Sequence, residues 1–217
     1  MYLTRMRLDV SKRDTMRALA EPKLFHGAIE RSFAGERRRH LWRIDALAGA
    51  QYLMLLSEER PNLDAAVQQF GCPKLPSPWE TRDYAPLLAR IAPNTTWQFR
   101  LTANPTKRAP GNAATATRGK VLPHITAEHQ EQWLLEKAPK HGFALTKGQF
   151  MPVQEQWYQF RKPQEGNRPV SLLSVTFEGR LTVTDAELFR RTLMEGIGRA
   201  KAYGMGMLTV VRAVDAP

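Results

Sequence analysis

A glycine-rich segment near residue 200 has the residue types and spacing to hold a phosphate. Two cations, Arg199 and Lys201, are enclosed there by Gly196, Gly198, Gly204 and Gly206. Glycine lets the backbone take positive φ and approach a ligand closely, and the amides of such a turn form an anion-binding concavity. A dinucleotide fingerprint is excluded because Lys201 stands where its third glycine belongs, and the Gly-Lys-Ser/Thr of a P-loop is absent. The segment therefore predicts either a phosphate-binding loop or a purely conformational link between a helix and a strand.

His26 is the residue with the best setting for proton transfer. Phe25 and Ile29 take the core side of a predicted helix, so Lys23, His26 and Glu30 share its other face. An imidazole titrates near neutral pH and can move a proton there, although a plain solvated surface residue explains the same pattern. The other histidines have no comparable setting, and no metal-binding spacing links them: His40, His124, His129 and His141.

Composition points to a polyanionic partner. The 217 residues include 32 Lys and Arg against 21 Asp and Glu, giving a net charge of +11 and a pI near 10.1. A field of this sign favours nucleic acid. Cys72 is the single cysteine, which excludes an internal disulfide and a cysteine-cluster metal site and fits a reducing cytoplasm. No targeting segment or membrane-spanning apolar run is present, so no membrane partner is expected.

The first half of the chain predicts the order β-α-β-β-α. Residues 2–10 alternate with a period of two and form a strand with a basic face. Asp14 can cap a short helix that ends at Ala20, and Pro22 opens a second helical segment. Two strands at 41–45 and 51–57 and a helix at 63–70 follow. A proline-rich passage then carries one more edge strand.

The second half repeats that order. A strand starts at Trp97, a helix covers 126–140, and extended or hairpin segments cover 143–154, 155–162 and 170–178. The capping box from Thr184 to Glu187 opens a helix that ends at Gly196, and residues 207–211 form the last strand. The predicted fold is α+β, with two tandem ferredoxin-like (RRM-like) βαββαβ domains at 1–93 and 94–217.

Three further basic segments are candidates for contact with a polyanion. Arg161 and Lys162 follow Trp157 and Phe160 in a predicted hairpin, and at least one of these two aromatic residues is expected to pack in the core. The stretch 104–125 predicts a mobile basic loop that carries cations at Lys107, Arg108, Arg118 and Lys120. The run of arginines at 37–39 is equally consistent with a charged connector and with a contact.

The chain resembles the CasE endoribonucleases of type I-E CRISPR systems. The resemblance rests on the opening Met-Tyr-Leu-Thr, on Phe-Arg-Leu-Thr-Ala-Asn-Pro-Thr-Lys at 99–107, on Phe-Glu-Gly at 177–179 and on the glycine-rich tail at 196–206. These motifs run from end to end in the family's order. The resemblance implies two ferredoxin-like domains, recognition of the repeat hairpin in precursor CRISPR RNA and a metal-free cut at the stem base. It also implies retention of the product within the Cascade complex, whose backbone protein is the expected neighbour.

The same resemblance assigns roles within the expected site. His26 matches the catalytic histidine in the helix after the first strand, and no cofactor is implied. Lys23 stands where familiar members carry a tyrosine, so the role of that position is open. Lys23 and Arg31 are the candidates for the scissile phosphate. The expected RNA-binding residues are Arg161, Lys162, Arg199, Lys201, Gly196, Gly198, Gly204, Gly206, Lys107 and Arg108.

Little else is needed for such a cut, because RNA supplies its own nucleophile. The protein must align the 2′-hydroxyl with the adjacent phosphorus, move a proton and stabilise charge on the phosphate. A non-catalytic RNA-binding subunit with the same fold and charge is the alternative. The sequence contains no RNA-recognition-motif consensus and no helix-turn-helix or zinc-finger signature, which disfavours a conventional RNA-recognition motif and a DNA-binding module.

Overall fold

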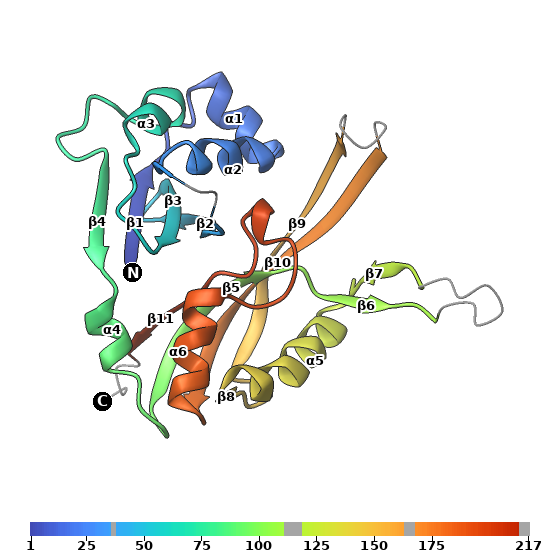
Figure 1. Cartoon of the computed structure of the whole chain (residues 1–217). Helices are drawn as coiled ribbons and strands as arrows, with labels where there is room; N and C mark the ends of the chain where they lie inside the picture. The colour runs from blue at the N-terminus through green and yellow to red at the C-terminus, as the bar shows by residue number, and fades with distance from the viewer. Residues whose placement is uncertain (36–37, 111–118, 163–167, 213–217) are drawn as a thin grey trace.

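The computed structural model describes residues 1–35, 38–110, 119–162 and 168–212 and has an α+β fold with several antiparallel sheets. Figure 1 shows two halves, each a sheet covered by helices. The first sheet has the strand order β2-β3-β1-β4. Its strands are β1 (Tyr2–Arg7), β2 (Leu41–Leu47), β3 (Ala50–Ser57) and β4 (Trp79–Asp83). The helices of this half are α1 (Arg13–Ala20), α2 (Lys23–Glu30), α3 (Asp64–Phe70) and α4 (Ala85–Ala89).

The period-two pattern of β1 sorts its side chains between core and solvent. Thr4 and Met6 are buried and Arg5 and Arg7 are exposed, as alternation predicts. The strand ends at Arg7 rather than at Val10, and Val10 is half exposed. One core cluster gathers Met6 with apolar residues from β2, β3 and the three longer helices, among them Phe25, Ile29, Trp42, Leu53, Leu55 and Phe70. This cluster fixes α2 against the sheet.

The second sheet has the order β11-β5-β10-β8, and β9 pairs with β10. Its strands are β5 (Thr96–Ala103), β8 (Phe143–Ala144), β9 (Phe150–Lys162), β10 (Arg168–Val183) and β11 (Leu208–Arg212). A small separate sheet pairs β6 (Thr106–Arg108) with β7 (Val121–Pro123). The helices of this half are α5 (Ala127–Lys137), the 3₁₀ turn η2 (Ala138–His141), α6 (Ala186–Glu195) and the 3₁₀ turn η4 (Lys201–Tyr203).

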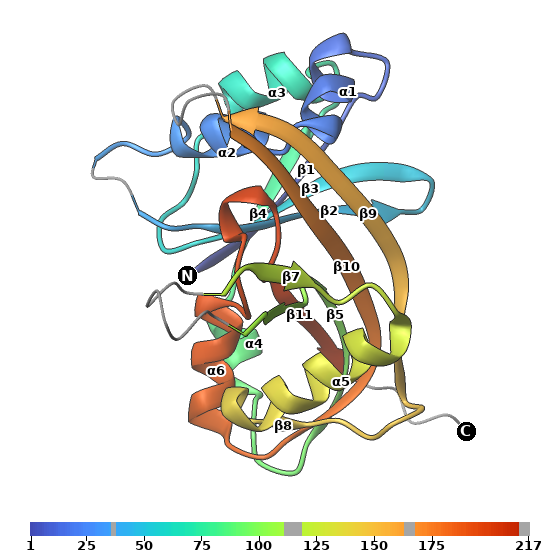
Figure 2. The same ribbon diagram turned by 90° about the vertical axis from the view of Figure 1, so that its right-hand side faces the viewer.

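The β9–β10 hairpin is much longer than the sheet that holds it. Figure 2 shows it running from the end of the molecule near α5 up to the side of α2. Its base belongs to the second core, where Trp133 of α5 stacks on Phe177 of β10 with ring centroids 6.4 Å apart. The far end of β9 therefore lies beside a helix that is distant in the sequence.

A buried ion pair joins the two halves. Arg43 and Asp45 on β2 form two hydrogen bonds of 2.7 Å, and both side chains are at least 95% buried. Arg43 Nη1 also donates to the backbone carbonyls of Arg100 and Met207, each at 2.9 Å. The guanidinium thus has partners in both halves, which compensates its removal from water.

Most predicted elements are confirmed, but several boundaries differ, and the stretch 104–125, predicted as a loop, contains the strands β6 and β7. Asp185, not Thr184, is the N-cap of α6 and accepts from the backbone N–H of Leu188. The N-cap of α1 is Lys12, and Asp14 lies in its first turn. Helix α5 changes to a 3₁₀ turn after Lys137, and residues 150–162 form one strand where the sequence predicts two segments. None of the helices in the described residues is long and apolar enough to cross a membrane.

Candidate active site

Helix α2 presents His26 on its polar face. Phe25, Ala28 and Ile29 are buried on the other face, so Lys23, His26 and Glu30 share the outer side, as the sequence predicts. His26 Nε2 lies 3.2 Å from Glu30 Oε1, one helical turn away, and the two side chains are 30% and 26% exposed. The imidazole is therefore oriented by a carboxylate and still reaches solvent.

His40 lies close to this pair, which the sequence pattern does not predict. Its ring stacks on Phe33 with centroids 3.9 Å apart. Burial lowers the pKa of His40, nearby Glu30 opposes that shift, and the charge of His26 adds to it. Such mutual influence requires the two imidazoles to be near each other. This electrostatic interaction links α2 to the segment before β2, and the spacing of residues within one element does not reveal it.

The two other predicted catalytic residues lie at opposite ends of α2. Lys23 begins the helix and pairs with Glu21, with Nζ 3.3 Å from Oε2. Arg31 is the C-cap and is exposed, and its Nη1 lies 3.5 Å from the place a side chain at Gly27 would occupy. Both cations are thus on the helix that carries His26 and can meet the charge of a phosphate.

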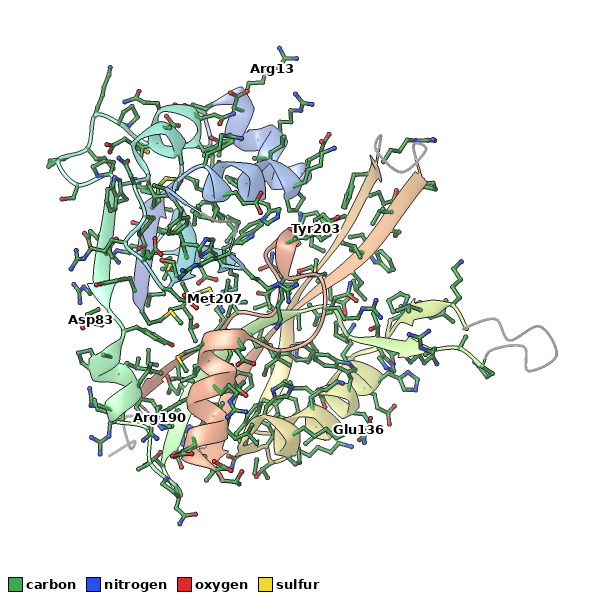
Figure 3. The ribbon with its side chains drawn as sticks, in the orientation of Figure 1. Arg13, Asp83, Glu136, Arg190, Tyr203 and Met207 are labelled. Atoms are coloured by element: carbon green, nitrogen blue, oxygen red, sulfur yellow. The ribbon has the colours of Figure 1, made fainter. Side chains whose placement is uncertain are left out.

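Phe160 connects the hairpin to α2 and to the glycine segment. Its side chain is 8% exposed, its ring centroid lies 5.1 Å from that of Tyr203, and Lys23 Nζ lies 6.0 Å from the same ring. Figure 3 labels Tyr203 between α2 and the hairpin. Trp157 is 46% exposed, so the expectation that at least one of the two aromatic residues packs inside is confirmed by Phe160. The cluster brings three distant segments together at one end of α2.

The two expected cations of the hairpin follow Phe160 directly. Arg161 is exposed, and its neighbouring position on the strand directs it to the face opposite Phe160. Lys162 ends β9 and pairs with Arg168 in the ladder. This end of the hairpin is the part of β9 nearest to α2 (Figure 2). Arg161 and Lys162 are therefore within the same region as Lys23.

The glycine segment owes most of its glycines to packing. All four take positive φ, and Gly196, Gly204 and Gly206 are buried. A Cβ on Gly204 would lie 2.8 Å from the ring of Trp42, too close for any real side chain. Only Gly198 among the four is exposed, together with Arg199, while Lys201 Nζ donates to the carbonyl of Glu195. Gly198 and Arg199 are thus the members of the segment that face solvent.

Lys107 and Arg108 are not brought to this region. Both are exposed on β6, and Arg108 Nη1 donates to the carbonyl of Gly119 at 3.3 Å. Figures 1 and 2 both place the β6–β7 hairpin away from α2, beside α5. Arg118 of the expected basic loop and Arg37 of the arginine run lie outside the described residues. In the described parts of the chain, no group of three or more His, Cys, Asp or Glu side chains could hold a metal.

Comparison with known proteins identifies full-length relatives. The family model for CRISPR-associated protein matches residues 1–212. The CRISPR-associated endoribonuclease Cse3 of Thermus thermophilus is 31% identical over 221 residues, covering 97% of this chain and 99% of the relative. A structure of Cse3 bound to a 19-nucleotide RNA aligns with a TM-score of 0.76 at 28% identity, over 96% of this chain and 98% of that one. Escherichia coli Cas6e shares the fold, with a TM-score of 0.68 at 20% identity over 98% and 100%.

Proposed function

The chain belongs to the Cse3/Cas6e family of type I-E CRISPR-associated endoribonucleases, and from that premise we propose that it cuts the repeat stem-loop of precursor CRISPR RNA at the base of the stem. A structure of Thermus thermophilus Cse3, 27% identical with a TM-score of 0.76, holds an RNA that represents a pre-cleavage complex and supports the substrate class. The product stays bound, and the protein joins the Cascade surveillance complex in the cytoplasm beside its backbone protein.

The observation that carries the mechanism is the His26–Glu30 pair on the polar face of α2. The RNA 2′-hydroxyl attacks the adjacent phosphorus, so a 2′-oxygen to phosphorus bond forms and the bond to the 5′-oxygen breaks. His26 moves a proton in this exchange, from the 2′-hydroxyl or to the departing 5′-oxygen. Glu30 Oε1, 3.2 Å away, fixes the direction of the ring. No metal or other cofactor takes part in these steps.

The charge that builds on the phosphate is met by cations around His26. Lys23 and Arg31 flank it on α2, and Arg199 with the amide of Gly198, both exposed in the glycine segment, adds a further cation and donor for the RNA phosphates. Cations and backbone amides fixed before the reaction stabilise the transition state without reorganising. Lys23 stabilises the negative charge of the phosphate, at a position where familiar members of the family carry a tyrosine.

RNA binding involves a wider set of basic residues. Arg161, Lys162, Arg199 and Lys201 hold the stem near the cut, and Lys107 and Arg108 contact phosphates farther along the RNA. The platform is a pair of ferredoxin-like domains, at 1–93 and 94–217. In support, the strand order β4-β1-β3-β2 of the first half recurs in the second as β11-β5-β10-β8.

The product ends of a cleavage reaction test this proposal. Purified protein in EDTA should cut a cognate repeat hairpin and leave a 2′,3′-cyclic phosphate, or its 3′-phosphate product, and a free 5′-hydroxyl. A matched hairpin with a single 2′-deoxy sugar upstream of the cut should stay whole. Cleavage of the deoxy hairpin would exclude the 2′-hydroxyl as nucleophile. Binding without cleavage of the all-ribose hairpin would favour the alternative of a non-catalytic RNA-binding subunit.

A further inference from the structure

A cavity of about 250 Å³ lies between the two halves of the molecule, beside α2. One wall comes from α1, α2 and β2, and the other from the face of the second sheet formed by β5, β9 and β10. It is small compared with the roughly 300–1,000 Å³ of sites for drug-sized ligands, so it suits one planar ring system. Gln154 and Gln156, both exposed, line it on the β9 side. The cavity is therefore reachable from solvent.

Neutral hydrogen-bonding groups dominate the lining. Hydroxyls from Thr102, Thr176 and Ser174 join the amides of Gln154 and Gln156. Side-chain amides carry donors and acceptors together, which is the pattern needed to read the edge of a nucleobase. No carboxylate is found among the described lining residues. The single guanidinium of that lining, on β2, is already paired with the carboxylate two residues along the same strand.

Aromatic residues complete the lining. Phe25 and Trp42 form its buried floor, while Tyr158 and Tyr203 are partly exposed and are rings on which an unpaired base can stack. Together with the neutral amides and hydroxyls, these partly exposed rings suit an unpaired base better than a free phosphate.

The cavity lies at the start of the helix that carries the candidate catalytic residues. Pro22 and Phe25 belong to the α2 segment that carries the catalytic histidine, while Tyr203 and Gly204 belong to the glycine segment. Tyr203 packs on Phe160, whose ring lies under the lysine that begins α2. An RNA strand that passes from the histidine around the start of α2 would bring an unpaired nucleotide to this opening.

We propose that this cavity is a subsite for one unpaired nucleobase that flanks the cleaved phosphate. The proposal rests on the RNA-cutting function proposed above and adds to it a reading of single-stranded sequence. The base packs against Tyr158 and Tyr203, and Gln154 and Gln156 hydrogen-bond its edge. Sequence preference beside the stem then comes from neutral amides, separately from the cations that hold phosphates.

An abasic scan tests the subsite. Hairpins with a constant stem carry an abasic residue at one flanking position at a time, and affinity and single-turnover cleavage are measured with each. For the wild type, one position should show a loss of roughly tenfold, as expected for a stacked and hydrogen-bonded base. The Gln154→Ala/Gln156→Ala variant should lose about tenfold on the intact hairpin. Placing the abasic residue at the same position should then cause no further loss for this variant. Gln159→Ala, on the same strand and also exposed, is the matched control and should behave as wild type.

The abasic scan gives different results if the subsite exists and if it does not. An abasic penalty present in the wild type and absent in the double variant supports the subsite. A wild type with no penalised position, or a double variant that keeps the full penalty, would overturn it. A double variant with normal RNA binding and cleavage that no longer assembles with other Cascade subunits would also overturn it, by assigning the cavity to a protein. Failure of the proposed cleavage function gives a different result. In that case the intact hairpin stays uncut at saturating wild-type protein, while the loss of binding affinity caused by each abasic position can still be measured.

Discussion

The ring of Phe160 packs on the ring of Tyr203 with centroids 5.1 Å apart, and this contact fixes the end of the long hairpin to the glycine segment. Lys23 of α2 also lies over the Phe160 ring, with Nζ 6.0 Å from its centroid. Three segments that are far apart in the sequence are thereby held at one place. The arrangement of cations around His26 depends on this cluster.

Phe160→Ala should therefore damage both stability and cleavage. Removing a buried phenylalanine costs about 3 kcal/mol or more of unfolding free energy, through lost apolar burial and the cavity that remains. Cleavage should also slow in the folded fraction, because the hairpin loses its contact with Lys23. Trp157→Ala on the same strand is the control, since that side chain is 46% exposed. Chemical denaturation and single-turnover cleavage measure the two effects, and equal losses in the two variants would contradict this role.

Gly204 and Gly49 form a matched pair for the glycine segment. Their φ angles are 78° and 75°, but a Cβ at Gly204 would meet the Trp42 ring at 2.8 Å while one at Gly49 would meet nothing within 4 Å. Gly49→Ala should cost about 1 kcal/mol for the left-handed backbone alone. Gly204→Ala should cost about 2 kcal/mol more for the clash. Denaturant unfolding compares them, and equal costs would show that Trp42 yields freely.

The order of elements was predictable because it depends on local signals. Alternation in β1, the apolar stripe of α2 and the glycine stop at Gly196 are all encoded within a few residues. The sequence pattern places the cap of α6 one residue early, because Thr184 and Asp185 are both good capping residues and only the chain path selects between them. Boundaries depend on such small differences.

The composition of the site was only partly predictable. His26 and Glu30 share a helical face, so spacing alone brings them together. The Phe33–His40 stack folds the connection between α2 and β2 back on itself, and the contact between the hairpin and the glycine segment joins elements that only the tertiary fold makes neighbours. The glycines of the glycine segment correctly predict positive φ. The sequence does not show that the ring of Trp42 fills the space beside Gly204. Contacts between elements that are distant in the sequence produce no periodic pattern of residues, so they cannot be predicted from spacing.

Arg161 and Lys162 should carry the salt dependence of RNA binding near the cut. Replacing both by alanine should weaken binding and reduce the slope of log affinity against log salt by about one unit per lost phosphate contact. Lys140→Ala/Lys147→Ala is the control, because Lys147 precedes β9 and lies about 40 Å from Arg161 along a strand of that length. Filter binding at several salt concentrations gives the slopes. A slope equal to that of the wild type would exclude the hairpin from phosphate contact.

Two half-buried histidines, His40 and His141, should make the fold sensitive to mild acid. Burial lowers the pKa of His141, helped by the charges of Lys137 and Lys201, and burial also lowers that of His40 against the opposing carboxylates around it. The unfolded chain then binds more protons below about pH 6.5, so stability is highest above that pH and falls as the pH drops through it. His141→Gln should flatten the pH dependence of the unfolding midpoint. An unchanged slope would show that His141 protonates without penalty in the folded protein.

The most direct measurement of the central claim is a parallel assay of binding and cleavage by His26→Ala on the cognate repeat hairpin. A proton-transfer residue contributes about 10²–10⁴-fold to rate and little to affinity spread over a basic surface. We expect single-turnover cleavage to fall by at least about 100-fold while the dissociation constant stays within about twofold of the wild type. Wild-type cleavage by the variant would exclude His26 as the proton-transfer residue, and so would a loss of affinity large enough to explain the loss of rate.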